Sequence, residues 1–478
     1  KMGKMWGGRF TKKINPLVEE FTKSIQFDKK LAEYDCLGSI AHAKMLGKCN
    51  IIPKKDSANI ISGLNSILSQ IKKGSFKIDN SVEDIHTLIQ NALDKKIGKS
   101  SGMLHTARSR NDQVSLDMRM YCKKEINSIV TLVTCLKASI KEFSKKNIDV
   151  IVPGFTHLQN AQPVLLSHQM LAYCQMLGRD IDRLNDCGKR VDVMPLGSCA
   201  ISGTSLAIDR NFVAKELGFS KVSSNSMDAV SDRDFVIEII SNLAILGMHL
   251  SRLSEDLIIW NSQGFGLVDI GDEFCTGSSM MPQKKNPDVL ELVRGKCGTR
   301  YGSLVEIMTV MKGLPLTYNR DMQLDKEPLF KSIEVAESSL RILTAFFKGL
   351  KVNKDRASEL LQDESIYATD IMEYLVKKGI SLKDSHNIVG KIVSYGVERK
   401  LKLSEISLRH LRFFSSKFNK DVYELLDAKK SVSLKSSFGG TLTMNKPFCF
   451  ILRYVFIFAL VSLSPCSTCC LKAQEICI

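Results

Sequence analysis

Hydrophobic residues recur at alternating spacings of four and three along two long parts of this chain. The first series follows about Val114 and comprises Cys122, Ile126, Ile129, Val133, Leu136, Ile140 and Phe143. The second comprises Val236, Ile239, Leu243, Leu246, Leu250, Leu253 and Leu257. A seven-residue repeat places its apolar members on one side of an α-helix, so each series predicts a long helix packed within a bundle.

The same periodicity predicts helices on both sides of these two. Residues 56–71 form an amphipathic pattern, with Asp56 as the expected N-cap and Gly74 as the stop. Further long helices are predicted over residues 163–190, 288–311 and 326–347. Shorter helices are predicted after residue 350, among them 357–361 and 365–377, and strand signals are few and short.

These elements predict an all-α protein of three helical domains with a central bundle of long helices. We place an N-terminal helical domain at residues 1–108, the central bundle at 109–350 and a small C-terminal helical domain at 351–441. Antiparallel helices longer than about 25 residues need partners on more than one face. We therefore expect a homotetramer that shares a multi-helix core.

Composition and charge narrow the function classes. Hydrophobic residues make up 44% and charged residues 25%, which is typical of a soluble globular protein. The net charge of +16 is scattered along the chain and no nucleic-acid motif is present, so we expect no nucleic-acid partner. Nine cysteines, from Cys36 to Cys297, stand singly and without metal-ligand spacing. They predict a reduced, cytoplasmic protein without a metal site.

Residues 442–478 form an atypical tail. Its stretch from Phe448 to Ser464 is almost wholly apolar, is broken by Arg453 and leads into a cysteine-rich end. Three interpretations remain open: a non-native tail, a buried hydrophobic helix or a membrane anchor. We favour the first and expect no membrane association, because a run with a central arginine is marginal for a membrane span.

The segment from Thr276 to Asp288 carries the densest chemistry. Its glycine and prolines exclude a regular helix, and a helix start follows it directly. The loop is therefore expected to place Ser278, Lys284 and Asn286 at a helix N-terminus, where backbone N–H groups attract carboxylates.

Two other polar segments also precede predicted long helices. One runs from Leu104 to Gln113 and includes Asn111, and the other runs from Gly154 to Gln159 and includes Thr156 and His157. Any of these residues alone is more often a helix cap or a packing residue. Three such segments at helix entrances predict a composite active site.

These motifs resemble those of the argininosuccinate lyase family within the fumarase/aspartase superfamily. The resemblance covers roughly residues 5–441. It rests on Trp6-Gly7-Gly8-Arg9-Phe10, Arg108-Ser109-Arg110-Asn111-Asp112-Gln113, Gly154-Phe155-Thr156-His157-Leu158-Gln159, Gly277-Ser278-Ser279-Met280-Met281-Pro282-Gln283-Lys284-Lys285-Asn286 and Thr317-Tyr318-Asn319-Arg320-Asp321-Met322-Gln323. It implies a helical tetramer with four sites, each built from loops of three subunits. It also implies the reversible cleavage of argininosuccinate to fumarate and arginine without metal or organic cofactor.

The resemblance also implies roles for individual residues. Ser278 matches the serine that acts as base, and His157 matches the histidine on the opposite face of the substrate, with Glu291 orienting it. Lys284 and Asn286 match the clamp on the carboxylate of the dianionic intermediate, while Asn111 and Thr156 match substrate-binding positions. Positions that hold the arginine portion are Ser24, Tyr318, Gln323 and Lys326. Which of Ser278 and His157 takes the proton stays open, and Arg110 and Arg233 are equally compatible with structural salt bridges.

The sequence departs from the family pattern at three places. Asn160 stands where arginine is usual, and Cys199 replaces a usual glycine, which predicts a perturbed backbone turn. The third departure is the tail.

Two other functions remain as alternatives: a sister lyase acting on adenylosuccinate or another fumarate adduct, and a non-catalytic relative of the lens-crystallin kind. The residues from Gln283 to Lys285 and around Tyr318 argue against the first, and the intact catalytic positions argue against the second.

Overall fold

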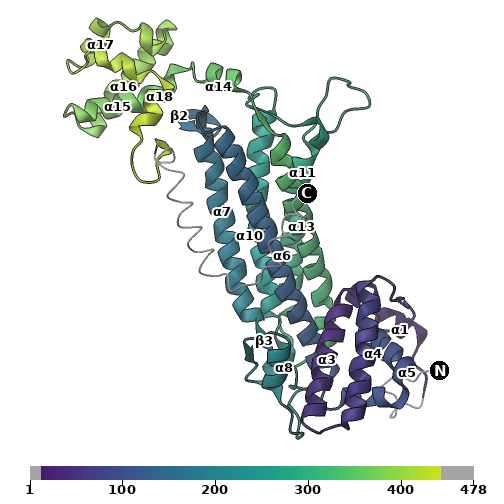
Figure 1. Ribbon diagram of the computed structural model, residues 1–478. Helices are drawn as coiled ribbons and strands as arrows, with labels where there is room; N and C mark the ends of the chain where they lie inside the picture. The colour runs from purple at the N-terminus through teal and green to yellow at the C-terminus, as the bar shows by residue number, and fades with distance from the viewer. Residues whose placement is uncertain (1–11, 443–478) are drawn as a thin grey trace. The chain divides into compact units, whose positions relative to one another are not determined.

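The computed structural model describes residues 12–442 (Figure 1). The motif from Trp6 to Phe10 and nearly all of the atypical tail, residues 443–478, lie outside the described part. The described chain divides into two compact units, each assembled from three sequence segments. The first unit combines the chain up to Leu132 with residues 179–248 and 295–339. The second combines residues 133–178 and 249–294 with the chain from Leu340 onward.

Four long helices contribute residues to both units. They are α6 (Arg110–Lys146), α7 (Leu166–Val191), α10 (Asp234–Asn261) and α13 (Lys326–Gly349). Every member of the two predicted heptad series is buried, which confirms the helices and the faces on which they pack.

Contacts between these helices recur within each unit. In the first unit Ser128 on α6 donates to Glu337 on α13 at 2.9 Å. In the second, the ring of Phe143 on α6 meets that of Phe347 on α13 with centroids 5.7 Å apart. Helix α10 is long and apolar enough to pass a test for a membrane span, but 61% of its most apolar stretch is buried inside the protein. That degree of burial is typical of a core helix.

The remaining helices of the first unit are short or of moderate length. They are α1 (Pro16–Phe21), α2 (Ile25–Asp28), α3 (Ala32–Lys48), α4 (Lys54–Lys72), α5 (Ile85–Ile97), α8 (Arg210–Glu216), α9 (Ser226–Ser231) and α12 (Cys297–Met311). A parallel pair, β3 (Val193–Met194) and β4 (Lys221–Val222), completes this unit.

The second unit holds two antiparallel strand pairs and the C-terminal helices. The strands are β1 (Ile151–Thr156) with β2 (Gln159–Leu165), and β5 (Val268–Asp269) with β6 (Lys351–Val352). Its other helices are α11 (Asp288–Gly295, whose last residue belongs to the first unit), α14 (Lys354–Leu360), α15 (Ala368–Lys377), α16 (Leu382–Arg399), α17 (Leu408–Phe414) and α18 (Ala428–Leu434). An apolar core joins α15, α16 and α17 around Leu375, Ile392 and Phe418.

Several sequence-based boundaries were wrong. The helices expected over 357–361 and 365–377 are α14 and α15, which begin at Lys354 and Ala368. Helix α4 begins at Lys54 after Pro53, so Asp56 lies in its first turn and is not the cap, whereas Gly74 does end it with φ +67°. The helix expected from residue 163 begins only at Leu166, because β2 occupies the preceding residues. The helix expected over 288–311 is interrupted at Lys296, beside Gly295, a residue with low helix propensity.

Candidate active site

The serine loop, residues 276–287, is closed at its base by a short antiparallel bridge. Thr276 and Asn286 exchange both backbone hydrogen bonds, at 2.8 and 3.2 Å. Inside the loop, the Oγ of Ser278 accepts the backbone N–H groups of Met280 and Met281 at 3.3 and 3.1 Å. Two N–H donors aimed at one hydroxyl oxygen favour a negative charge on that oxygen.

The two lysines of the serine loop have different surroundings. The Nζ of Lys285 lies 3.0 Å from Asp269 and 2.8 Å from Asp272, and the hydrogen bond to Asp272, followed by that to Asp269, raises the pKa of Lys285. Lys284 is exposed and forms no ion pair with any residue that the structure describes. Of the two ammonium groups, that of Lys284 is therefore the one left for a ligand.

The loop leads directly into α11, as the sequence predicted. The hydroxyl of Thr276 hydrogen-bonds the carboxylate of Asp288, the first residue of the helix, and the Nδ2 of Asn286 donates to Gly277 at 3.4 Å. Glu291 lies in the first turn and is exposed. The helix start and the serine loop thus form one connected structure.

The segment that carries Thr156 and His157 is a hairpin. Sequence analysis treated it as a loop before a helix, whereas Thr156 in β1 pairs with Gln159 in β2 and β2 continues into α7. His157 and Leu158 form the turn with φ +55° and +58°. A two-residue turn with both residues at positive φ suits the twist of a hairpin, although Asn or Gly is the usual choice. The turn leaves the His157 ring exposed to solvent.

Asn160, which replaces the usual arginine, follows the turn. Its Nδ2 donates to the carboxylate of Asp363 at 3.1 Å. The substitution therefore keeps a polar contact at this position, although it lacks the charge of arginine.

The predicted catalytic residues share no hydrogen bond or ion pair in the part of the chain that the structure describes. Ser278, His157 and Glu291 all belong to the second unit. The expected contact between Glu291 and His157 stays a prediction.

Asn111 lies at the start of α6 and is fixed by a buried carboxylate beside it. Asp112 accepts the backbone N–H groups of Ser109, Gly197 and Cys199 at 2.9, 2.9 and 2.8 Å. The Nδ2 of Asn111 donates to the carbonyl of Ala200 at 3.0 Å. Burial raises the pKa of Asp112 to about 6, against the lowering effect of these hydrogen bonds.

Ser24 and Gln323 lie in neighbouring segments of the first unit. The hydroxyl of Ser24 donates to Asp28 at 2.6 Å, and the Nε2 of Gln323 donates to the carbonyl of Thr22 at 3.2 Å. Arg320 donates to the same carbonyl at 2.7 Å. Two predicted binding positions, 299 residues apart in sequence, are thereby brought together.

Lys326 is held in a buried charge cluster. Its Nζ donates to Asp325 at 2.8 Å, and the other carboxylate oxygen of Asp325 accepts from Arg233. Lys326 is only 5% exposed. This geometry favours the structural role for Arg233. Burial raises the pKa of Tyr318, and the negative charge of Asp325 acts in the same direction.

Arg110 is engaged in a similar way. Its Nε lies 3.4 Å from Asp84, and its Nη1 donates to Gln113 at 3.1 Å.

Sequence reasoning missed the carboxylates that hold these positions, namely Asp28, Asp84, Asp112 and Asp325. Asp28, Asp112 and Asp325 each lie within four residues of a predicted site residue, which is their only local signal, whereas Asp84 lies near none.

Two protein-family models and several known lyases match this chain. A family model described as Lyase matches residues 8–302, and a model described as Argininosuccinate lyase C-terminal matches residues 365–433. The argininosuccinate lyase of Trichlorobacter lovleyi is 50% identical over 438 residues, which is 92% of this chain and 96% of the relative. That of Acetivibrio thermocellus is 48% identical over 437 residues, 91% and 95% of the two chains.

The chain belongs to the argininosuccinate lyase family.

Solved structures agree on the fold. An EDDS lyase in complex with formate has a TM-score of 0.79 at 24% identity and covers 96% of this chain and 94% of its own. A class II fumarase from Schistosoma mansoni has a TM-score of 0.71 at 17% identity, covering 83% and 90%. The predicted all-α class is therefore confirmed, and the polar segments of this family member occupy a fold shared by several lyases.

Proposed function

We propose that this protein catalyses the reversible elimination of argininosuccinate to L-arginine and fumarate. Family membership supports the substrate, and the hydrogen bonding of Ser278 supports the chemistry. A proton must leave the carbon next to a carboxylate, and a guanidino nitrogen leaves from the neighbouring carbon. A hydroxyl that already accepts two N–H groups is suited to act as the base.

The dianionic intermediate needs positive and N–H partners around its carboxylate. Lys284, whose ammonium group is not engaged by a described residue, and Asn286 at the start of α11 supply them in this proposal. Thr156 and Asn111 bind the substrate from the other two segments. His157, at the exposed hairpin turn, protonates the leaving nitrogen, with Glu291 orienting it. The reverse assignment, with His157 as base, stays open.

The arginine portion binds in the first unit. Ser24 and Gln323, which lie in neighbouring segments, hold one end, and Tyr318 and Lys326 complete the set. Lys326 is buried and donates to Asp325. In this proposal the substrate carboxylate therefore meets the Lys326–Asp325 pair, and not a lone ammonium group. We propose no metal or organic cofactor.

The site forms in a homotetramer, in which three segments come from three copies of the chain. Helix α12 supports this assembly. Tyr301, Val305 and Met308 lie on one face of the helix and are 45%, 65% and 54% exposed in the single chain. Apolar residues at helical spacing and with this exposure are typical of a surface that another subunit covers. We expect the tetramer to be cytoplasmic, as the free cysteines suggest.

A fumarate-release assay tests the activity. The full chain is incubated separately with argininosuccinate and with adenylosuccinate, and fumarate formation is followed by its ultraviolet absorbance. We expect release from argininosuccinate alone. Release only from adenylosuccinate would identify a sister lyase, and release from neither by a folded tetramer would favour a non-catalytic relative.

A further inference from the structure

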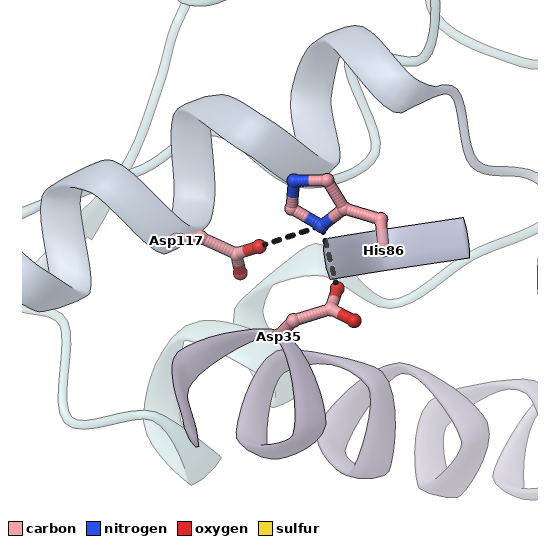
Figure 2. Close-up of side chains that lie close together, drawn as sticks. All are labelled: Asp35, His86 and Asp117. Atoms are coloured by element: carbon pink, nitrogen blue, oxygen red, sulfur yellow. Dashed lines mark ion pairs between the residues drawn. The ribbon is translucent and has the colours of Figure 1, made fainter. Parts of the chain in front are cut away.

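Two carboxylates and an imidazole meet inside the first unit. Asp35 on α3, His86 on α5 and Asp117 on α6 have side chains that are at most 2% exposed. The Nδ1 of His86 lies 3.3 Å from Asp35 and 3.4 Å from Asp117 (Figure 2). None of the three is a predicted substrate or catalytic residue.

Asp35 extends this cluster to the beginning of α6. Its Oδ1 accepts a hydrogen bond from the Nε2 of Gln113, two residues after Asn111. The positive charge of Arg108, three residues before Asn111, also acts on Asp35. Arg108 in turn donates to Ser39, one helical turn from Asp35 on α3, at 2.8 Å. The segment that carries Asn111 is therefore fixed to α3 on both sides.

His86 connects the same cluster to the segment that carries Ser24. The backbone N–H of Ile85, the residue before His86, donates to Asp28 at 3.1 Å. The second oxygen of Asp28 accepts the hydroxyl of Ser24 at 2.6 Å. The start of α5 thus bridges two predicted binding segments.

The charges of these three side chains favour a structural role for the cluster over the binding of a metal cation. Burial and the nearby Asp35 raise the pKa of Asp117 well above its usual range, which favours its protonated form. Burial also acts to raise the pKa of Asp35, but the hydrogen bond and charge of His86 and the charge of Arg108 outweigh it, and that pKa is lowered. A protonated carboxyl is a poor metal ligand, and Asp35 already has protein partners.

We propose that Asp35, which pairs with His86, is a positioning residue for substrate binding: through the hydrogen bond from Gln113 it fixes the turn that presents Asn111. The inference rests on the proposed function, because it assigns to that turn a part of the argininosuccinate site. Asp35 itself touches no substrate, so its loss should alter binding more than the chemical step.

The test is Asp35→Asn in the full chain. Asparagine keeps an acceptor oxygen but loses the charge that strengthens the hydrogen bond from Gln113, so KM for argininosuccinate should rise by about tenfold and kcat should fall by less than about threefold. Amide hydrogen exchange of residues 108–113 should become faster, and Asp35→Glu should restore KM in part. As a control, Asp370→Asn alters a carboxylate that is also 2% exposed but pairs with Lys435 and Ser431 in the other unit. It should change neither KM nor this exchange.

If Asp35→Asn fails to fold, Gln113→Met breaks the same link from its other end and should give the same rise in KM. A folded tetramer of either variant with unchanged KM and unchanged exchange would overturn the proposal. If the wild-type protein releases no fumarate from argininosuccinate, the proposed function fails. The exchange measurement would then still decide whether Asp35 holds the turn.

Discussion

The buried carboxylate of Asp112 accepts the backbone N–H of Cys199 at 2.8 Å, and Cys199 has a positive φ of 53°. The bond explains why a residue with a side chain is tolerated where the family usually has glycine. It also ties the turn at 197–200 to the start of α6, where Asn111 donates to Ala200. The carboxylate of Asp112 therefore stabilises both the strained turn at Cys199 and the start of α6, where the predicted substrate-binding residue Asn111 lies.

Cys199→Gly should stabilise the protein. Glycine adopts positive φ without the steric cost of a Cβ, so we expect a gain of about 0.5–1 kcal/mol in the free energy of unfolding after the greater entropy of the unfolded chain is subtracted. Asn50→Gly is the matched control, because Asn50 has the same φ of 53° and asparagine tolerates it better. Thermal unfolding measures the change in melting temperature that Cys199→Gly and Asn50→Gly each cause relative to the wild-type protein. A lower melting temperature for Cys199→Gly would show that the thiol contact with Ala107, at 3.3 Å, outweighs the strain.

Asp112 should make stability depend on pH between about 4 and 6. Its pKa in the folded state, about 6, lies above the ordinary carboxyl value of 3.8, so the folded state binds the proton more tightly. The stability contributed by this proton is fully present below pH 4 and is lost as pH rises towards 6. Relative to Asp112→Asn, the wild-type protein should lose about 1–3 kcal/mol across this range.

Denaturant titrations of both proteins at several pH values measure this difference. A difference that stays constant from pH 4 to 7 would show that the pKa of Asp112 is not raised.

Arg300 should destabilise the fold. Its guanidinium is fully buried, and burial lowers its pKa to about 10. Nη2 donates to the carbonyl of Val335 and to Ser339, but among the described residues Nε and Nη1 have no hydrogen-bond partner. Gly247 makes room for the group, since a Cβ there would lie 2.7 Å from Nη1. Arg300→Met should raise the free energy of unfolding by about 1–3 kcal/mol.

Arg233→Met provides the opposite case. Arg233 is equally buried but pairs with Asp325, so its replacement should cost about 3–5 kcal/mol by leaving a buried carboxylate partly uncompensated. The prediction for Arg300 is wrong if both substitutions lower the melting temperature by similar amounts.

Sequence reasoning located the long helices because a seven-residue repeat is a strong and local signal. It missed the hairpin at 151–165 because His157 and Leu158 take up positive φ without being glycine or asparagine, so no turn residue marks the position. It could not find the Asp35–His86–Asp117 cluster, whose members lie on three helices with no characteristic spacing. Likewise, the partners of Asp112 at Gly197 and Cys199 are set by packing and not by the neighbouring sequence.

The central claim is that Ser278 and His157 act in one site but come from different copies of the chain. Ser278→Ala and His157→Asn should each reduce kcat by about 100-fold or more while leaving the tetramer intact. Among the described residues, no hydrogen bond or ion pair joins the two within one chain.

Mixing the two inactive tetramers under conditions that exchange subunits tests this claim most directly. If each site takes the serine and the histidine from different subunits, a random one-to-one mixture has both intact in about one quarter of its sites. We predict recovery of roughly that fraction of wild-type argininosuccinate cleavage. No recovery, in a mixture whose subunit exchange is verified by mass spectrometry, would contradict the shared site.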